Sequence, residues 1–193
     1  AGWLLNPAGN STPNVVLTSG AATRAGDPET GGTIDPTGAG WLRLTNNTNN
    51  LHNAVFFDTP IPSAGNSVNV QFGVNMFGGN NFSGTGADGL TFFLYDASKS
   101  FVVGANGGSI GYAQKDATQG ADMPDGMNGG FVAVALDAYG NFSVNGEGRQ
   151  GGTATLQPNS VAVRGPGQGQ TGYDYLAGTG NRDLTDTGSP TTL

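Results

Sequence analysis

Apolar and polar residues alternate along Ser67–Phe77, where every second residue from Val68 to Met76 is apolar. Successive side chains of a β-strand point to opposite faces, so this segment is predicted to be a strand with one face in the core. Shorter apolar runs, each bounded by Gly, Pro, Asn or Asp, predict seven more strands: Val15–Thr18, Trp41–Thr45, Ala54–Asp58, Leu90–Tyr95, Phe101–Val103, Phe131–Asp137 and Ser160–Arg164. No window has the 3.6-residue period of a helix. The pattern predicts an all-β antiparallel sandwich or barrel with Greek-key or jelly-roll connections.

The composition agrees with a turn-rich β-protein. The chain has 193 residues, 35 of them glycine, and only 11% are charged. Its hydrophobic fraction of 36% is gathered into short runs, as in a folded chain rather than a disordered one. We therefore expect one domain, over residues 1–181, followed by a polar tail or link to further strands at 182–193.

Charge and cysteine content exclude several classes of function. The net charge is -7, and the seven Lys and Arg residues are scattered from Arg24 to Arg182, so no basic patch for nucleic acid is expected. There is no cysteine for disulfides or thiolate metal sites, and no apolar stretch of membrane-spanning length. Low Lys with high Asn, Gly and Thr is typical of bacterial secreted proteins, so we expect a mature exported domain at the cell surface or outside the cell.

Candidate chemistry follows the strand Phe131–Asp137. Asp137 ends this strand, and the carbonyl of Tyr139 and the side chain of Asn141 follow at alternating positions, with Asn145 or Glu147 available from the same loop. Carboxylate, amide and backbone oxygens are the ligands that Ca²⁺ prefers. The same spacing is also typical of a turn in which Asp and Asn side chains cap backbone amides, and the sequence leaves both interpretations open.

Three separated motifs together resemble a known family, the legume-like L-type lectins, in their bacterial branch. The motifs are, in chain order, Gly86-Ala-Asp-Gly-Leu-Thr-Phe-Phe-Leu94, Gly107-Gly-Ser-Ile-Gly-Tyr112 and Val132-Ala-Val-Ala-Leu-Asp-Ala-Tyr-Gly-Asn-Phe-Ser143. Glu147–Gly152 and Pro158–Gly167 resemble the same branch. The resemblance covers most of the chain from about Trp3 to Asn181.

The resemblance implies a concanavalin-like jelly-roll sandwich with sugar and calcium bound side by side at loops. Asp88, reached through a cis Ala87–Asp88 peptide, would accept hydrogen bonds from sugar hydroxyls, and Gly107 and Gly108 would offer backbone N–H groups. Asn141 would donate to the sugar, and Tyr139 would lend its ring. The implied calcium ligands are Asp137, the Tyr139 carbonyl and Asn141, with Asn145 and Glu147 as candidates to complete the set.

The chain departs from the family pattern at three points. Ala135 stands where plant members have a glutamate that binds a transition metal, so none is expected here. Asn145 stands where the family often has an acidic ligand, which leaves the calcium ligand set open. The chain also ends at Leu193, before several strands of the family domain, so the sandwich is expected to be incomplete, with the rest supplied by another chain, a separate fragment or residues beyond this sequence.

No enzyme is expected. His52 is the only histidine, and Glu29 and Glu147 are the only glutamates, far apart in sequence and without the paired carboxylates that glycoside hydrolases use. The leading hypothesis is a calcium-dependent carbohydrate-binding domain of a bacterial secreted or surface adhesin. The alternative is a structural or assembly subunit of an extracellular filament or surface protein, in which a second chain or an oligomer covers the open sheet edges.

Overall fold

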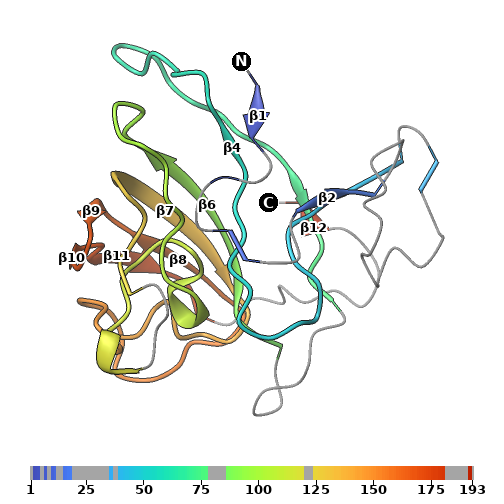
Figure 1. Ribbon diagram of the computed structural model, residues 1–193. Coiled ribbons are helices and arrows are strands. Elements are labelled where there is room, and N and C mark those ends of the chain that lie inside the picture. The colour runs from blue at the N-terminus through green and yellow to red at the C-terminus, as the bar shows by residue number, and fades with distance from the viewer. Residues whose placement is uncertain are drawn as a thin grey trace.

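The structure is a computed structural model of the chain, shown in Figure 1. It describes residues 2–4, 7, 10–11, 15–18, 35–36, 39–77, 86–119, 124–180 and 191–192. Within these residues there is no α-helix, only two single-turn 3₁₀ helices, η1 (Gly107–Ser109) and η2 (Ala117–Gln119). Every pair of strands with three or more residues in register is antiparallel. The expected all-β antiparallel character is therefore confirmed.

One sheet dominates the fold. Its three long members lie side by side in Figure 1: β6 (Gly89–Tyr95), β7 (Gly130–Asp137) and β8 (Ser160–Arg164). β7 is central, pairing with β6 from Gly89↔Asp137 onwards and with β8 up to Asp137↔Ser160. The β-branched and aromatic residues of these strands suit such a pleated surface. This register places the start of β6, the end of β7 and the start of β8 at one edge, where the site lies.

The two faces of this sheet are apolar but differently covered. On the first face, Ala133, Ala135 and Ala162 are fully buried under side chains from loops, among them those of Tyr112 and Phe142. We call this the loop-covered face. On the second face, which we call the opposite face, Leu136 packs with Val74, Phe72, Met76, Leu90 and Val161. Small residues on the loop-covered face let the loops approach the sheet closely, which fixes their positions.

Short strands complete the described structure. The pairs are β1 (Trp3–Leu4) with β4 (Phe56–Phe57), β2 (Val16–Leu17) with β3 (Leu42–Arg43), and β5 (Gly73–Val74) with β12 (Thr191–Thr192). The large sheet is extended by β9 (Gly167–Gln168), β10 (Thr171–Gly172) and β11 (Tyr175–Gly178). No helix among the described residues is both long and apolar enough to cross a membrane.

The strand predictions outside the central sheet were wrong in extent. Val15–Thr18, Trp41–Thr45 and Ala54–Asp58 each contain a strand of two residues, β2, β3 and β4. Of the segment Ser67–Phe77, only Gly73–Val74 pairs as a strand within the described residues, and Val68 and Val70 are exposed. Alternation marks a face that can be buried, but a strand also needs a hydrogen-bonded neighbour, and among the described residues β12 supplies one for two residues only. Phe101–Val103 is buried in the core without strand pairing. The expected tail 182–193 lies outside the described residues except for Thr191–Thr192.

Candidate functional site

Asp88 and Asp137 lie together because their strands are paired neighbours. Asp88 immediately precedes β6, Asp137 is the last residue of β7, and Gly89 stands opposite Asp137. The Asp88 carbonyl accepts hydrogen bonds from the backbone N–H of Ala138 at 3.0 Å and of Tyr139 at 3.2 Å. The Ala87–Asp88 peptide is cis. The two carboxylates therefore stand at one sheet edge, on backbone that is hydrogen-bonded across the strand ends.

The second element of the site is the turn around η1. Gly108 is buried, and a Cβ atom there would overlap the side-chain amide of Asn141. The Asn141 side chain also donates a hydrogen bond to the Asp88 carboxylate. Asp88, Gly108 and Asn141, which are far apart in the sequence, thus meet at one point. Gly108 is needed there because any larger residue would occupy the space of the Asn141 amide.

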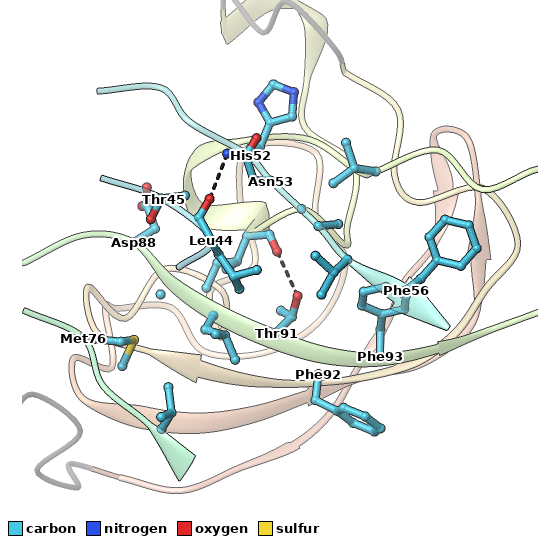
Figure 2. A pocket seen from close by; sticks show the side chains of 18 of the residues that line it. Leu44, Thr45, His52, Asn53, Phe56, Met76, Asp88, Thr91, Phe92 and Phe93 are labelled. Carbon is cyan, nitrogen blue, oxygen red and sulfur yellow. Dashed lines mark hydrogen bonds between the residues drawn. The ribbon is translucent and has the colours of Figure 1, made fainter. Parts of the chain in front are cut away.

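The η1 turn is hydrogen-bonded to strand β6. The Thr91 hydroxyl on β6 donates to the Ile110 carbonyl at 3.0 Å, as Figure 2 shows, and the Ser109 hydroxyl donates to the Gln114 carbonyl at 2.7 Å. In the same view Thr91 and Phe93 lie on one face of β6 and Phe92 on the other, with Asp88 beyond the start of the strand. The turn that carries Gly108 is therefore hydrogen-bonded to β6 by the Thr91 side chain, and its own backbone bonds, such as Ile110 N–H to the Gly107 carbonyl at 2.9 Å, close it.

The Asp137 carboxylate is turned toward its own loop. Its Oδ1 accepts the N–H of Gly140 at 2.7 Å and its Oδ2 accepts the N–H of Phe142 at 2.8 Å, both in the interior. The pKa of Asp137 is raised to about 6, mainly by burial and to a smaller degree by the negative charge of Asp88, against the opposing effect of the backbone N–H groups of Gly140, Phe142 and Ser143. Asp137 therefore caps the turn that presents Asn141, in line with the capping interpretation of its spacing.

The electrostatic environment of Asp88 is mixed. Burial raises its pKa, whereas the Asn141 hydrogen bond and the charges of Lys115 and Arg149 lower it, and Glu147 raises it. Lys115 approaches the site from the side of Gly107, where its Nζ lies 3.2 Å from the position that a Cβ would take. The site thus combines a half-buried hydrogen-bond acceptor with a neighbouring cation.

Of the remaining predicted residues, Tyr139 joins the site, and Asn145 and Glu147 take other partners. Tyr139 is half-buried and lines the same concave surface as Asp88, Gly107, Gly108 and Asn141. Asn145 is exposed, and its backbone N–H donates to Thr153 at 3.0 Å. Glu147 also lines this surface, but its carboxylate forms a 2.9 Å ion pair with the buried guanidinium of Arg149.

Two buried arginines hold the loops of the site. Arg149 donates from Nη1 to the Ser109 hydroxyl at 3.1 Å, which joins the Glu147 loop to the η1 turn. Arg164, at the end of β8, is fully buried. Its guanidinium donates to four backbone carbonyls at 2.7 to 3.1 Å, those of Phe142, Gln150, Tyr173 and Val144. It also lies 5.4 Å from the centroid of the Phe142 ring. The guanidinium of Arg164 therefore holds the loop after β7 in place.

Two oxygen-bearing side chains of the site suit a calcium ion. Asn141 Oδ1 is buried and accepts no hydrogen bond from the described residues, and Asp137 is a buried carboxylate whose raised pKa a cation would lower. No three His, Cys, Asp or Glu side chains gather as a metal site in the part of the chain that the structure describes. Asp137 and Asn141 fit the role of ligands, whereas the ion pair with Arg149 removes Glu147 from the set.

Lys115, Arg149 and Arg164 are the residues that sequence reasoning missed. Arg149 and Arg164 fall inside segments that carry the resemblance, but only their contacts show that they hold loops. Lys115 had no signal in the sequence, since one lysine outside a charge cluster looks like any solvated residue.

No protein-family model, curated protein or solved structure matches the chain.

Proposed function

We propose that this chain is a carbohydrate-binding domain whose site is formed by Asp88, Gly107, Gly108, Tyr139 and Asn141. The observation that carries the proposal is the meeting of three distant segments at one point, where the Asn141 amide lies against Gly108 and donates to Asp88. Burial raises the pKa of the Asp88 carboxylate, and a ligand-binding role would explain why an acidic group stands in this half-buried position.

The chemistry of the pocket suits a sugar. A hydroxyl group is both donor and acceptor, so the Asp88 carboxylate can accept its proton while the Asn141 amide or a Gly108 N–H donates to its oxygen. The backbone N–H groups of Gly107 and Gly108 make no hydrogen bond within the described residues. Tyr139 adds one aromatic surface for the apolar face of a sugar ring. The proposed action is binding, with no catalytic step.

Calcium has a supporting place in this proposal. Asp137 and Asn141, with the Tyr139 carbonyl, would hold the ion, which would supply a fixed positive charge and orient the Asn141 amide. The resident arginines already restrain the same loop, so we expect calcium to strengthen binding rather than to be required for folding. No transition-metal ligand set is proposed.

The architecture and setting are part of the proposal. A jelly-roll sandwich of the L-type lectin kind is supported by apolar side chains on both faces of the β6–β7–β8 sheet. The proposed setting is a bacterial secreted or cell-surface adhesin, in which modest affinity per site would be raised by multivalency. The composition, low in charge and without cysteine, supports that setting.

The proposal is tested by calorimetric titration of a glycan panel in excess calcium and in chelator, using the wild type and two variants. Asp88→Asn removes the acceptor at the centre of the site and is expected to weaken binding at least tenfold. Asp174→Asn changes an exposed aspartate that does not line the pocket and should leave affinity unchanged. The proposal is abandoned if no glycan binds in either condition, or if Asp88→Asn binds as well as the wild type.

A second function is favoured by a separate observation. On the opposite face of the sheet an apolar groove of about 290 Å³ is lined by Val68, Val70, Phe72, Phe92, Leu94, Val134 and Leu136. Val68 and Val70 in this groove are exposed, and groups of exposed apolar residues mark interaction surfaces. The chain would then act as an assembly subunit. Sedimentation velocity at high concentration tests this, since a single monomeric species counts against it.

A further inference from the structure

One charged group at the candidate site has no role in the function proposed so far. Lys115 lines the same concave surface as Asp88, Gly107 and Asn141. Its ammonium makes no hydrogen bond and no ion pair within the described residues. Its charge nevertheless acts on Asp88, whose pKa it lowers. A lysine that is half-buried at a pocket and lacks a close partner is available to a ligand.

The position of Lys115 relative to the sugar-binding groups is well defined. Its Nζ lies beside Gly107, 3.2 Å from the point where a Cβ atom would stand, and the Asn141 amide lies against Gly108 in the same way. Consecutive Cα atoms are about 3.8 Å apart. The ammonium and the amide therefore stand beside consecutive glycines, where one bound glycan can contact both.

The other charges at the site leave this ammonium as the group that can meet an anion. The Glu147 carboxylate is already paired with the Arg149 guanidinium, so these two charges largely cancel. Asp88 is occupied as the acceptor for hydroxyl groups in the proposed function. Asp116, the residue after Lys115, uses its carboxylate to accept hydrogen bonds from Thr118 at 2.7 and 2.8 Å. The uncapped N–H groups of Gly107 and Gly108 add donors on the same side.

We infer that Lys115 is a specificity-determining residue that selects acidic sugars, by binding a carboxylate or sulfate group of the glycan whose hydroxyls are held by Asp88 and Asn141. The inference rests on the proposed carbohydrate-binding function and names the substrate class of that site. A charge-assisted hydrogen bond from an ammonium to a carboxylate is stronger than one to a hydroxyl, so the acidic member of a sugar pair is bound more tightly. The preference falls as salt rises, since the lysine is in contact with solvent.

The test compares matched pairs of methyl glycosides, glucose with glucuronic acid and galactose with galacturonic acid. Affinities are measured by calorimetry for the wild type, Lys115→Gln and the control Lys99→Gln, an exposed lysine outside the pocket lining. For at least one pair, the wild type is expected to bind the acid about tenfold more tightly at low salt. Lys115→Gln removes this preference while affinity for the neutral sugar stays within about twofold, and Lys99→Gln behaves as the wild type.

The outcomes separate the inference from the proposed function. Equal affinity for acid and neutral sugar, or a preference that survives in Lys115→Gln, overturns the inference while Asp88-dependent sugar binding stands. An equal loss of both ligands in Lys115→Gln also overturns it, because the lysine would then only support Asp88. Failure of the wild type to bind any member of either pair overturns the inference, and the broader glycan panel then decides the proposed function. A preference that follows Lys115 and weakens with salt supports it.

Discussion

The loop-covered face and the opposite face of the β6–β7–β8 sheet are both apolar, yet they are covered to different extents. The loop-covered face has the larger core cluster and the buried polar groups: Ser109, Gln114, Asp137, Ser143, Arg149, Ser160 and Arg164 all lie at or behind its loops. The opposite face has a smaller cluster around Val74 and Leu136, and Val134 is 36% exposed. The larger core and the buried polar side chains of this molecule therefore lie beneath the candidate site, and the opposite face lacks a comparable cover among the described residues.

The largest expected effect follows from removing Arg164. Arg164→Ala removes a donor from four backbone carbonyls, of which that of Gln150 still accepts the Tyr175 N–H. Each carbonyl left without a donor costs roughly 1–3 kcal/mol, so we expect a total of about 4 kcal/mol of unfolding free energy. Urea unfolding measures it. Lys99→Ala, at an exposed lysine, is the control and should change stability by less than ~0.5 kcal/mol. A loss below about 1 kcal/mol in Arg164→Ala would show that the loop-covered face does not depend on this hub.

The two carboxylates of the site should differ in what they stabilise. Asp137→Asn replaces one acceptor oxygen by a donor facing a backbone N–H, and we expect a loss of roughly 1–3 kcal/mol in urea unfolding. Asp88→Asn removes a half-buried charge whose pKa is raised by burial, so stability should be unchanged or higher. Equal losses in the two variants would contradict the separation of a structural Asp137 from a ligand-binding Asp88.

A third change tests the close approach of two loops. Gly108→Ala places a Cβ atom in the space of the Asn141 amide and is expected to weaken glycan binding about tenfold or more. Gly180→Ala is a matched control, because a Cβ there meets no atom within 4 Å and Gly180 does not line the pocket. Calorimetric titration and thermal melting of both variants give binding and stability together. Retained affinity in Gly108→Ala would mean that Asn141 does not need its position over the η1 turn.

The smallest expected effect is alkaline destabilisation through the buried tyrosines. Burial raises the pKa of Tyr112 and of Tyr173, which contact each other edge to face at 5.4 Å. Their contribution to stability is complete below the unfolded pKa of about 10 and is lost as pH rises above it. Tyr112→Phe should cost about 1 kcal/mol at neutral pH, since its hydroxyl donates to Gly165 at 2.9 Å, and should reduce the loss above pH 10.

Thermal melting of wild type and Tyr112→Phe between about pH 8 and 11 gives this slope. Burial also lowers the pKa of Arg164, to about 10, which acts in the opposite sense because its deprotonation is easier in the folded state. The pair of proteins shares Arg164, so their difference isolates the tyrosine. An identical alkaline slope in both would contradict the prediction.

The sequence was most informative where burial alone decides the pattern. The strands of the central sheet are apolar runs, and their predicted limits agree with β6, β7 and β8 to within one residue. The Gly-rich segment of β9 and β10 has no alternation to reveal a strand, and the alternation of Ser67–Phe77 could not show that most of it lacks a partner. Pairing is a long-range property that a local pattern does not contain.

The same limit applies to the site. The motifs placed Asp88, Gly108 and Asn141 in separate loops. The register of β6 on β7 brings the first and third loops together, and the Thr91–Ile110 hydrogen bond ties the turn of Gly108 to β6. Capping by Asp137 was foreseeable from its spacing to Asn141. The Glu147–Arg149 ion pair and the hydrogen bonds from Arg164 to four carbonyls were not foreseeable, because each arginine contacts partners that are separated along the sequence.

The most direct test of a shared pocket is a ¹H–¹⁵N NMR titration with an oligosaccharide selected from the glycan panel. We predict that the backbone signals of Gly107 and Gly108 and the side-chain amide signal of Asn141 shift together and saturate at one ligand concentration, while the backbone signals of Gly180 and Lys99 do not shift. Saturable shifts confined to other residues, or separate midpoints for Gly108 and Asn141, would contradict a single site built from these loops.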